Sequence, residues 1–237
     1  MHKKTNKLYC KLYIFLFLLA ACQPVHVTRQ YYDEYINPKA SIDYDFTYNL
    51  NLPEEYMNAY FDVDSSLSRL KDELNYIEYP NQEMLVNTNI LSQSWIKEIA
   101  FYDDMFFFIA GSQALSMNER LKDFLQTQAQ RTEKSFMVMM NDTCFFINTL
   151  KIGNDLFRTA VVEIDIEELL KNSNLPDFAL SIDKTIVHGT QDNTMVDLVY
   201  EKAMRDKSLS GKARYENQSR QWVRSLAADN LIYIFAG

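Results

Sequence analysis

The stretch from Phe157 to Gly189 constrains the fold of this chain most, because it predicts a strand, a short helix and a hairpin in succession. Residues 157–166 alternate with the period of a β-strand. Asp165 can cap the helix that follows, and Pro176 ends it because proline disfavours helix at the preceding residue. The more apolar strand face holds Arg158, Ala160, Val162, Ile164 and Ile166.

A regular apolar stripe between Tyr56 and Ile77 is the second constraint. Its spacings alternate between four and three residues, which predicts one long amphipathic helix that ends before Pro80. Such a stripe packs either on its own domain or against a second copy, so a homodimer through residues 54–79 stays open. The stripe consists of Tyr56, Tyr60, Val63, Leu67, Leu70, Leu74 and Ile77.

Acidic residues in the same helix match part of the spacing of a calcium-binding loop. Asp62 and Asp64 would be its first and third ligands, but Leu67 stands where that loop requires glycine for a sharp turn. We therefore expect no calcium site, and we expect these acidic residues to form a solvated helical face.

The remaining segments predict a mostly antiparallel sheet. We expect helices over 82–91, 118–130 and 192–205, hairpins over 95–110 and 136–150, and late strands over 212–215, 221–226 and 231–235. A length of 237 residues suits one large domain or two small ones. The order of elements predicts an α+β fold, in which a long N-terminal helix packs on a mostly antiparallel sheet.

The N-terminus predicts export. A lysine-rich start without acidic residues leads into the apolar run 12–21, which is shorter than the roughly 20 residues of a membrane span. The run ends in Leu-Ala-Ala-Cys22, which resembles the bacterial lipobox, where cleavage precedes a lipidated cysteine. We expect a signal peptide over 1–21, a lipid anchor at Cys22, a tether over 22–53 and a position on the extracytoplasmic face of the membrane. An uncleaved signal anchor is the alternative.

Composition excludes several classes of function. Loss of the signal peptide removes four lysines, so the formal charge changes from −8 to −12. Such an acidic chain disfavours nucleic acid as a partner, and also adhesion to an anionic bilayer by charge alone. The histidines and cysteines form no zinc-binding pattern, Cys144 is expected to be buried, and the scattered glycines form no phosphate-binding loop. We expect no cofactor, no metal and no enzymatic activity.

Two motifs resemble the extracytoplasmic Cache sensor domains of bacterial receptors. Residues 160–166 resemble the strand that leads into a short helix in that family, and residues 178–189 resemble its closing hairpin. The resemblance implies a PAS/Cache-like sensor domain over 54–189 and a partial membrane-proximal module over 190–237. Its expected role is to sense or bind a small molecule. A receptor's sensor region, an anchored sensor subunit and a truncated receptor all stay open.

The same resemblance implies a ligand site. In the family, the aspartate at the position of Asp165 holds a cationic ligand group, and a carboxylate beside aromatic walls suits an amine. We expect Tyr102, Phe108 and Phe146 to form those walls, whereas a helix cap is the alternative role of Asp165. The Arg-Trp-Tyr cluster of amino-acid-binding members is missing, because Arg220-Gln-Trp lies too late in the chain. The ligand is therefore left open.

A second hypothesis needs no ligand. The chain could be a structural or interaction lipoprotein that holds a partner through the stripe of the 54–79 helix and an aromatic surface. Loss of a dimer when Leu67 and Leu70 become charged, with the fold intact, would favour this alternative.

Overall fold

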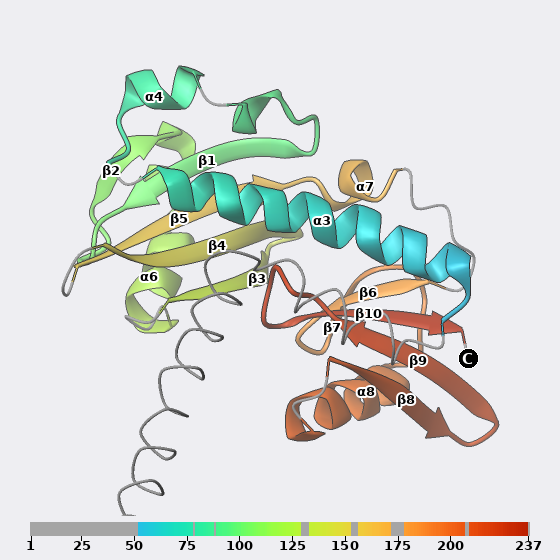
Figure 1. Cartoon of the computed structure of the whole chain (residues 1–237). Helices are drawn as coiled ribbons and strands as arrows, with labels where there is room; N and C mark the ends of the chain where they lie inside the picture. Colours follow the sequence, from blue (N-terminus) through green and yellow to red (C-terminus); the bar gives the residue numbers. More distant parts are fainter. Residues whose placement is uncertain are drawn as a thin grey trace, which may run out of the picture. The chain divides into compact units, whose positions relative to one another are not determined.

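The computed structural model describes residues 52–77, 79–87, 89–128, 133–152, 156–171, 178–206 and 209–236. They belong to one compact unit, Leu52–Gly237. The predicted signal peptide, Cys22 and the tether up to residue 51 lie outside the described residues. Two five-stranded sheets make up the unit, and helix α3 (Glu54–Tyr76) runs along both of them (Figure 1).

Helix α3 confirms the predicted amphipathic helix. Glu54 and Glu55 occupy its first turn, where carboxylates suit the positive end of the helix dipole. Leu67, Leu70 and Leu74 are fully buried within the chain itself. The stripe therefore forms core, and a homodimer through this helix would have to use its polar face.

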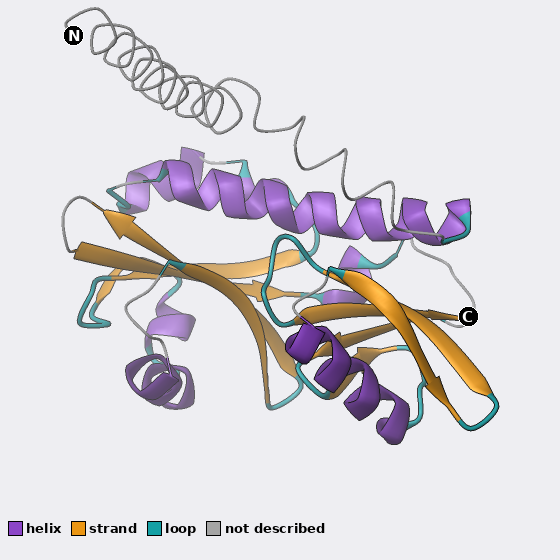
Figure 2. Cartoon of the chain, turned by 60° about the horizontal axis from the view of Figure 1, so that its bottom comes forward, coloured by secondary structure: helices purple, strands orange, loops and turns teal. Residues whose placement is uncertain are grey.

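The first sheet has the strand order β2-β1-β5-β4-β3, and every neighbouring pair is antiparallel. Helix α3 covers one face, and α6 covers the other through Leu121 and Leu125 (Figure 2). Its strands are β1 (Ile96–Tyr102), β2 (Phe108–Gly111), β3 (Lys134–Met140), β4 (Thr143–Ile152) and β5 (Leu156–Ile164). Its accompanying helices are α4 (Gln82–Asn87), the 3₁₀ turn η2 (Ile90–Ser92), α5 (Gln113–Ser116), α6 (Glu119–Gln128) and α7 (Ile166–Leu169).

The second sheet has the order β7-β6-β10-β9-β8, again antiparallel throughout. Helix α8 (Asn193–Asp206) covers one face through Met195, Val196 and Val199, which pack on Trp222. Tyr233 of the opposite face meets Tyr60 of α3 at 4.9 Å between ring centroids. The strands are β6 (Ala179–Ile182), β7 (Thr185–His188), β8 (Ser210–Tyr215), β9 (Gln218–Arg224) and β10 (Leu231–Ala236).

The structure corrects the expected place of the 178–189 hairpin. The sequence analysis groups this hairpin with the sheet before it, but β6 pairs with β10 in the second sheet. Turn residues determine that a hairpin forms, whereas its outer partner is chosen by packing over long sequence distances. Residues 190–237 therefore do not stand alone as a partial module, because with the hairpin they complete a five-stranded sheet.

Asp64 also departs from the prediction of a solvated face, because only 4% of it is exposed. Its carboxylate accepts hydrogen bonds from Leu226 N at 3.1 Å, Tyr60 OH at 3.2 Å, Tyr233 OH at 3.3 Å and the Ser225 hydroxyl. Most of these donors belong to β10 and the loop before it, which no pattern within the helix can reveal. Burial raises the pKa of the Asp64 carboxyl.

The loop between β9 and β10 also closes an edge of the first sheet. The Asn230 side chain accepts a hydrogen bond from Met137 N at 2.9 Å and donates one to Met137 O at 2.8 Å. Asp229 N donates to Ser135 O at 2.9 Å. Asn230 thus takes the place of a neighbouring strand, which protects β3 from pairing with another chain.

Candidate functional site

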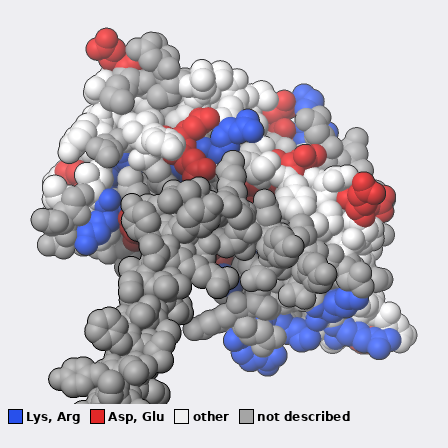
Figure 3. Space-filling model, viewed as in Figure 1, with Lys and Arg blue, Asp and Glu red and all other residues white. Residues whose placement is uncertain are grey.

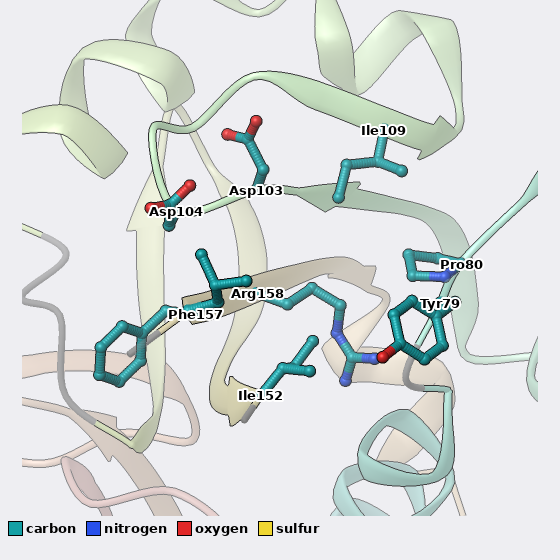
Figure 4. Close-up of a pocket in the computed structure, with 9 residues that line it drawn as sticks. Tyr79, Pro80, Asp103, Asp104, Ile109, Ile152, Phe157 and Arg158 are labelled. Carbon is teal, nitrogen blue, oxygen red and sulfur yellow. The ribbon is translucent and has the colours of Figure 1, made fainter. Parts of the chain in front are cut away.

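A cavity of about 350 Å³ lies at the end of the first sheet, beyond the C-terminal end of α3. Its lining comes from four places in the chain: the segment after α3, the β1–β2 turn, β2, and the β4–β5 end of the sheet (Figure 4). Most of the walls are apolar, and charged side chains enter at three positions. The lining residues are Tyr79, Pro80, Asp103, Asp104, Ile109, Ile152, Leu156, Phe157 and Arg158.

Arg158 forms the floor of the cavity. It occupies the apolar face of β5 that the sequence predicts, and only 1% of it is exposed. Its guanidinium donates to Leu74 O at 2.7 Å and lies over the Phe101 ring at 5.4 Å. Figure 4 shows it reaching toward Tyr79, whereas Phe157 points the other way, as strand alternation requires. These contacts tie the cavity floor to the last turn of α3.

Asp103 and Asp104 bring carboxylates to the cavity from the β1–β2 turn. One oxygen of Asp103 accepts from Met105 N at 2.9 Å and Phe107 N at 2.8 Å, which fixes the turn. Phe106, between these two donors, has a φ of 60°. The neighbouring Met105 and Phe107 are 54% and 65% exposed, so apolar surface extends outward from the cavity.

Asp165, the predicted ligand contact, caps α7. Its side chain accepts from Glu168 N at 3.0 Å, and it forms an ion pair with Lys97 at 2.9 Å. The hydrogen bond from Lys97 is the main cause that lowers the pKa of Asp165. The structure thus shows the helix cap that the sequence analysis offers as the alternative, and a ligand contact at Asp165 stays a prediction.

The three predicted aromatic walls do not surround one pocket. Tyr102 packs with Phe145 and Ile147 on the α6 face of the sheet, and its hydroxyl donates to Leu115 O at 3.1 Å. Phe146 is fully buried and faces the other way, because adjacent residues of a strand point to opposite faces. Phe108 meets Tyr102 edge to face at 6.2 Å. The structure therefore brings Tyr102 and Phe108 together and separates both from Phe146.

Sequence reasoning missed the residues that line the cavity. Arg158 was a usable signal, because a charged residue on an otherwise apolar strand face is rarely buried without a specific role. Asp103 and Asp104 lie at the turn of the predicted 95–110 hairpin, and no local pattern marks them as site residues. Their approach to Arg158 depends on the register between β1 and β5, which pairs Tyr102 with Thr159.

Two further features bear on the class of site. Among the described residues, no group of three or more His, Cys, Asp or Glu side chains could hold a metal ion. Within the same part of the chain, no helix has the length and apolar character needed to cross a membrane. Cys144 is buried as predicted, and burial raises the pKa of its thiol to about 12.

Neither a protein-family model nor a curated protein matches this sequence. Among solved structures, the chain is similar to the extracellular domain of the histidine kinase vpHK1S-Z8, with a TM-score of 0.47 and 12% identity over 76% of this chain and 88% of that one. The chain is also similar to the extracellular domain of the histidine kinase rpHK1S-Z16, with a TM-score of 0.45 and 14% identity over 76% of this chain and 86% of that one.

A third similar structure is the ligand-binding domain of the amino acid chemoreceptor PctB of Pseudomonas aeruginosa PAO1 in complex with L-Arg. Its TM-score is 0.45, with 10% identity over 77% of this chain and 85% of that one. Two of the three are extracellular domains of histidine kinases, and the third is the ligand-binding domain of a chemoreceptor. At this degree of similarity, the function of the chain has to be argued from its own residues.

Proposed function

We propose that this chain is an extracytoplasmic sensing module that binds a small molecule in the cavity of the first sheet. A lipid on Cys22 would hold it to the bacterial cell envelope. The cavity carries the proposal, because its volume of about 350 Å³ and its apolar walls with a few charged groups are typical of small-ligand sites. The anchor is supported by the four-residue motif before Cys22.

The position of the cavity suits a sensor. A ligand there would contact segments that are far apart in the sequence, including the β1–β2 turn and the start of β5. Arg158 on the floor donates to Leu74 O, so a ligand that moved this side chain would act directly on α3. Helix α3 also packs on the second sheet through Tyr60, so it is a physical route between the two sheets.

The alternative function, a lipoprotein that holds a partner, keeps one supporting observation. The exposed apolar residues of the β1–β2 turn could contact another protein. The stripe of α3 does not support it, because Leu67 and Leu70 are buried in the chain's own core.

Thermal unfolding in the presence of a library of small metabolites tests the proposal. A ligand at a hundred times its Kd should raise the Tm by about 5 to 10 °C. Leu156→Trp should abolish this shift, because Leu156 lines the cavity yet is 60% exposed, so the larger side chain can enter the cavity without disturbing the core. Leu209→Trp is the matched control, because Leu209 is 45% exposed and directly precedes β8 of the second sheet.

A compound that raises the Tm of Leu156→Trp as much as that of the unaltered chain would place its site elsewhere. The same assay with Asp165→Asn, which preserves the helix cap, asks whether Asp165 contacts the compound. An unchanged shift in that variant would leave Asp165 with a structural role alone.

A further inference from the structure

Charge is distributed very unevenly along this chain. Residues 52–177 contain 21 acidic and 10 basic residues, whereas residues 178–237 contain 7 acidic and 8 basic ones. The formal charge is therefore −11 in the first stretch and +1 in the second. The net charge of the whole chain conceals this segregation, so the net charge alone does not exclude an anionic bilayer as a partner of the second stretch.

The basic residues of the second stretch gather over α8, β8 and β9 (Figure 3). The β8–β9 hairpin, residues 210–224, contains four basic residues and a single acidic one, Glu216. Lys212 and Arg214 are exposed on the edge strand β8. We call Lys202, Lys212, Arg214 and Arg220 the basic corner.

Direct contacts hold the basic corner together. Lys202 of α8 donates to the backbone oxygen of Lys212 at 3.0 Å, and Arg220 pairs across the hairpin with Ala213. Because successive residues of a strand point to opposite faces, Arg220 lies on the α8 face, whereas Lys212 and Arg214 project from the other face of the edge strand β8. The basic corner therefore spans both sides of this sheet edge. Arg220 also donates to the neutral Gln191 side chain at 2.8 Å. Within the described ranges, none of the four residues joins an ion pair with a carboxylate. Lys212 and Arg214 are exposed, and Lys202 and Arg220 are half-buried.

Two acidic residues of α8, Asp197 and Glu201, are engaged elsewhere. Lys184 pairs with Asp197 at 3.3 Å and with Glu201 at 3.7 Å. Both carboxylates are ion-paired with Lys184. Each therefore neutralises the positive charge of the basic corner less than an unpaired carboxylate would.

We propose that the basic corner binds the surface of an anionic membrane. The corner lies on the second sheet, and the first turn of α3 packs on that sheet, with Tyr56 stacked on Phe235 at 5.1 Å. The described part of the chain therefore begins beside this sheet, at residue 52. This orientation rests on the proposed lipid anchor, whereas attraction between the corner and anionic lipid does not.

Each basic residue close to an anionic surface strengthens binding by about fivefold. Four such residues give reversible attachment, which becomes effective when an anchor keeps the domain near the membrane. The stretch 52–177, with its formal charge of −11, would be repelled from the same surface. The chain would stand with the second sheet at the membrane and the cavity directed away from it, which leaves the cavity open to a ligand.

Sedimentation with lipid vesicles tests the proposal. The chain without its signal peptide, residues 22–237 with Cys22→Ser, lacks both the lysine-rich apolar leader and the lipid anchor. It is mixed with vesicles of phosphatidylcholine alone or of equal parts phosphatidylcholine and phosphatidylglycerol. We expect stronger binding to the phosphatidylglycerol vesicles, and we expect high salt to remove the difference. The variant Lys212→Glu/Arg214→Glu should weaken that binding by about 25-fold or more, from two reversals at about fivefold each.

Arg69→Glu/Lys122→Glu is the matched control, because it changes the net charge equally at exposed sites on α3 and α6. This control should bind phosphatidylglycerol vesicles within about twofold of the unaltered chain. Equal loss in both variants would overturn the proposal, since net charge would then explain the binding. Binding of soluble heparin that depends on the corner, without binding to vesicles, would also overturn it and would indicate a soluble polyanion. A membrane result of either kind leaves the cavity proposal untouched.

Discussion

The two sheets share one topology but differ in what they can do. In each sheet the second strand lies at one edge, the order then runs first, fifth, fourth and third, and helix follows the second strand. The first sheet ends in a cavity with exposed apolar residues around it. The second sheet has a packed interior and a basic corner. Topology therefore does not decide function here, and the side chains at the sheet ends do.

Aromatic packing explains why the interior of the second sheet is closed. The ring centroid of Phe178 lies 5.4 Å from that of Phe235 and 6.1 Å from that of Tyr233. Tyr56 of α3 stacks on Phe235. Large rings fill the space between α3 and this sheet. At the cavity end of the first sheet, Arg158 and the short β1–β2 turn leave a hollow instead.

One glycine in each sheet occupies the same place and provides the largest test of this comparison. Gly111 is the last residue of β2 and has a φ of 120°, and an added Cβ would lie 2.3 Å from Ile99 O. Gly189 follows β7 with a φ of 79°, and its Cβ would lie 2.1 Å from Phe178 O. We expect Gly111→Ala and Gly189→Ala each to lower the free energy of unfolding by about 3 kcal/mol or more.

The two tryptophans allow this loss to be assigned to a sheet in urea unfolding. Trp95 precedes β1 and Trp222 lies in β9, so single Trp→Phe backgrounds report on one sheet each. Gly111→Ala should shift mainly the Trp95 signal, and Gly189→Ala mainly the Trp222 signal. If the unfolding transitions reported by Trp95 and Trp222 always shift together, the two sheets unfold as one cooperative unit. Asn58→Ala, exposed on α3, should stay within about 0.5 kcal/mol of the unaltered chain.

Asp64 sharpens the comparison, because it joins α3 to the second sheet rather than to the first. Burial raises its native pKa above the unfolded value of about 3.9, so the native state binds more protons. Its contribution to the free energy of unfolding is complete below that value and is lost as the pH rises through the native pKa. The stability of Asp64→Asn relative to the unaltered chain should therefore rise with pH over this window, by at most about 1.4 kcal/mol per pH unit.

Chemical denaturation at a series of pH values measures this slope. Asp62→Asn is the matched control, since it replaces an exposed aspartate of the same helix. Identical slopes for the two variants would show that Asp64 has no raised pKa in the native state.

The smallest expected effect concerns Asp165 at the end of the first sheet. Asp165→Ala removes the acceptor for Glu168 N and should cost about 1 kcal/mol. Asp165→Asn keeps a capping oxygen and loses only the Lys97 ion pair, whose side chains are 50% and 30% exposed, so it should cost less than about 0.5 kcal/mol. Thermal unfolding of both variants separates the contribution of the helix cap from that of the ion pair. Equal losses of stability in the two variants would rule out the capping role.

Local patterns predicted the elements well and the site poorly. The stripe of α3 and the alternation of β5 were visible because each depends on residues a few positions apart. The structure separates two of the predicted walls, because Tyr102 and Phe146 face opposite sides of the first sheet, and the face that each presents depends on the register with β5. Arg158 was placed on the correct strand face, yet its cavity is built by a turn more than 50 residues earlier in the chain.

By itself, the sequence determined the α+β class, the long amphipathic helix, the antiparallel hairpins and the Asp165 cap. Each of these follows from periodicity, capping or turn chemistry over a few neighbouring residues. The tertiary structure alone decided that there are two sheets, that Asp64 is buried, and that Asp103, Asp104 and Arg158 meet around a cavity. It also gathered the basic residues on one corner. These features depend on which distant segments pair, and that choice is made by packing and burial over the whole domain.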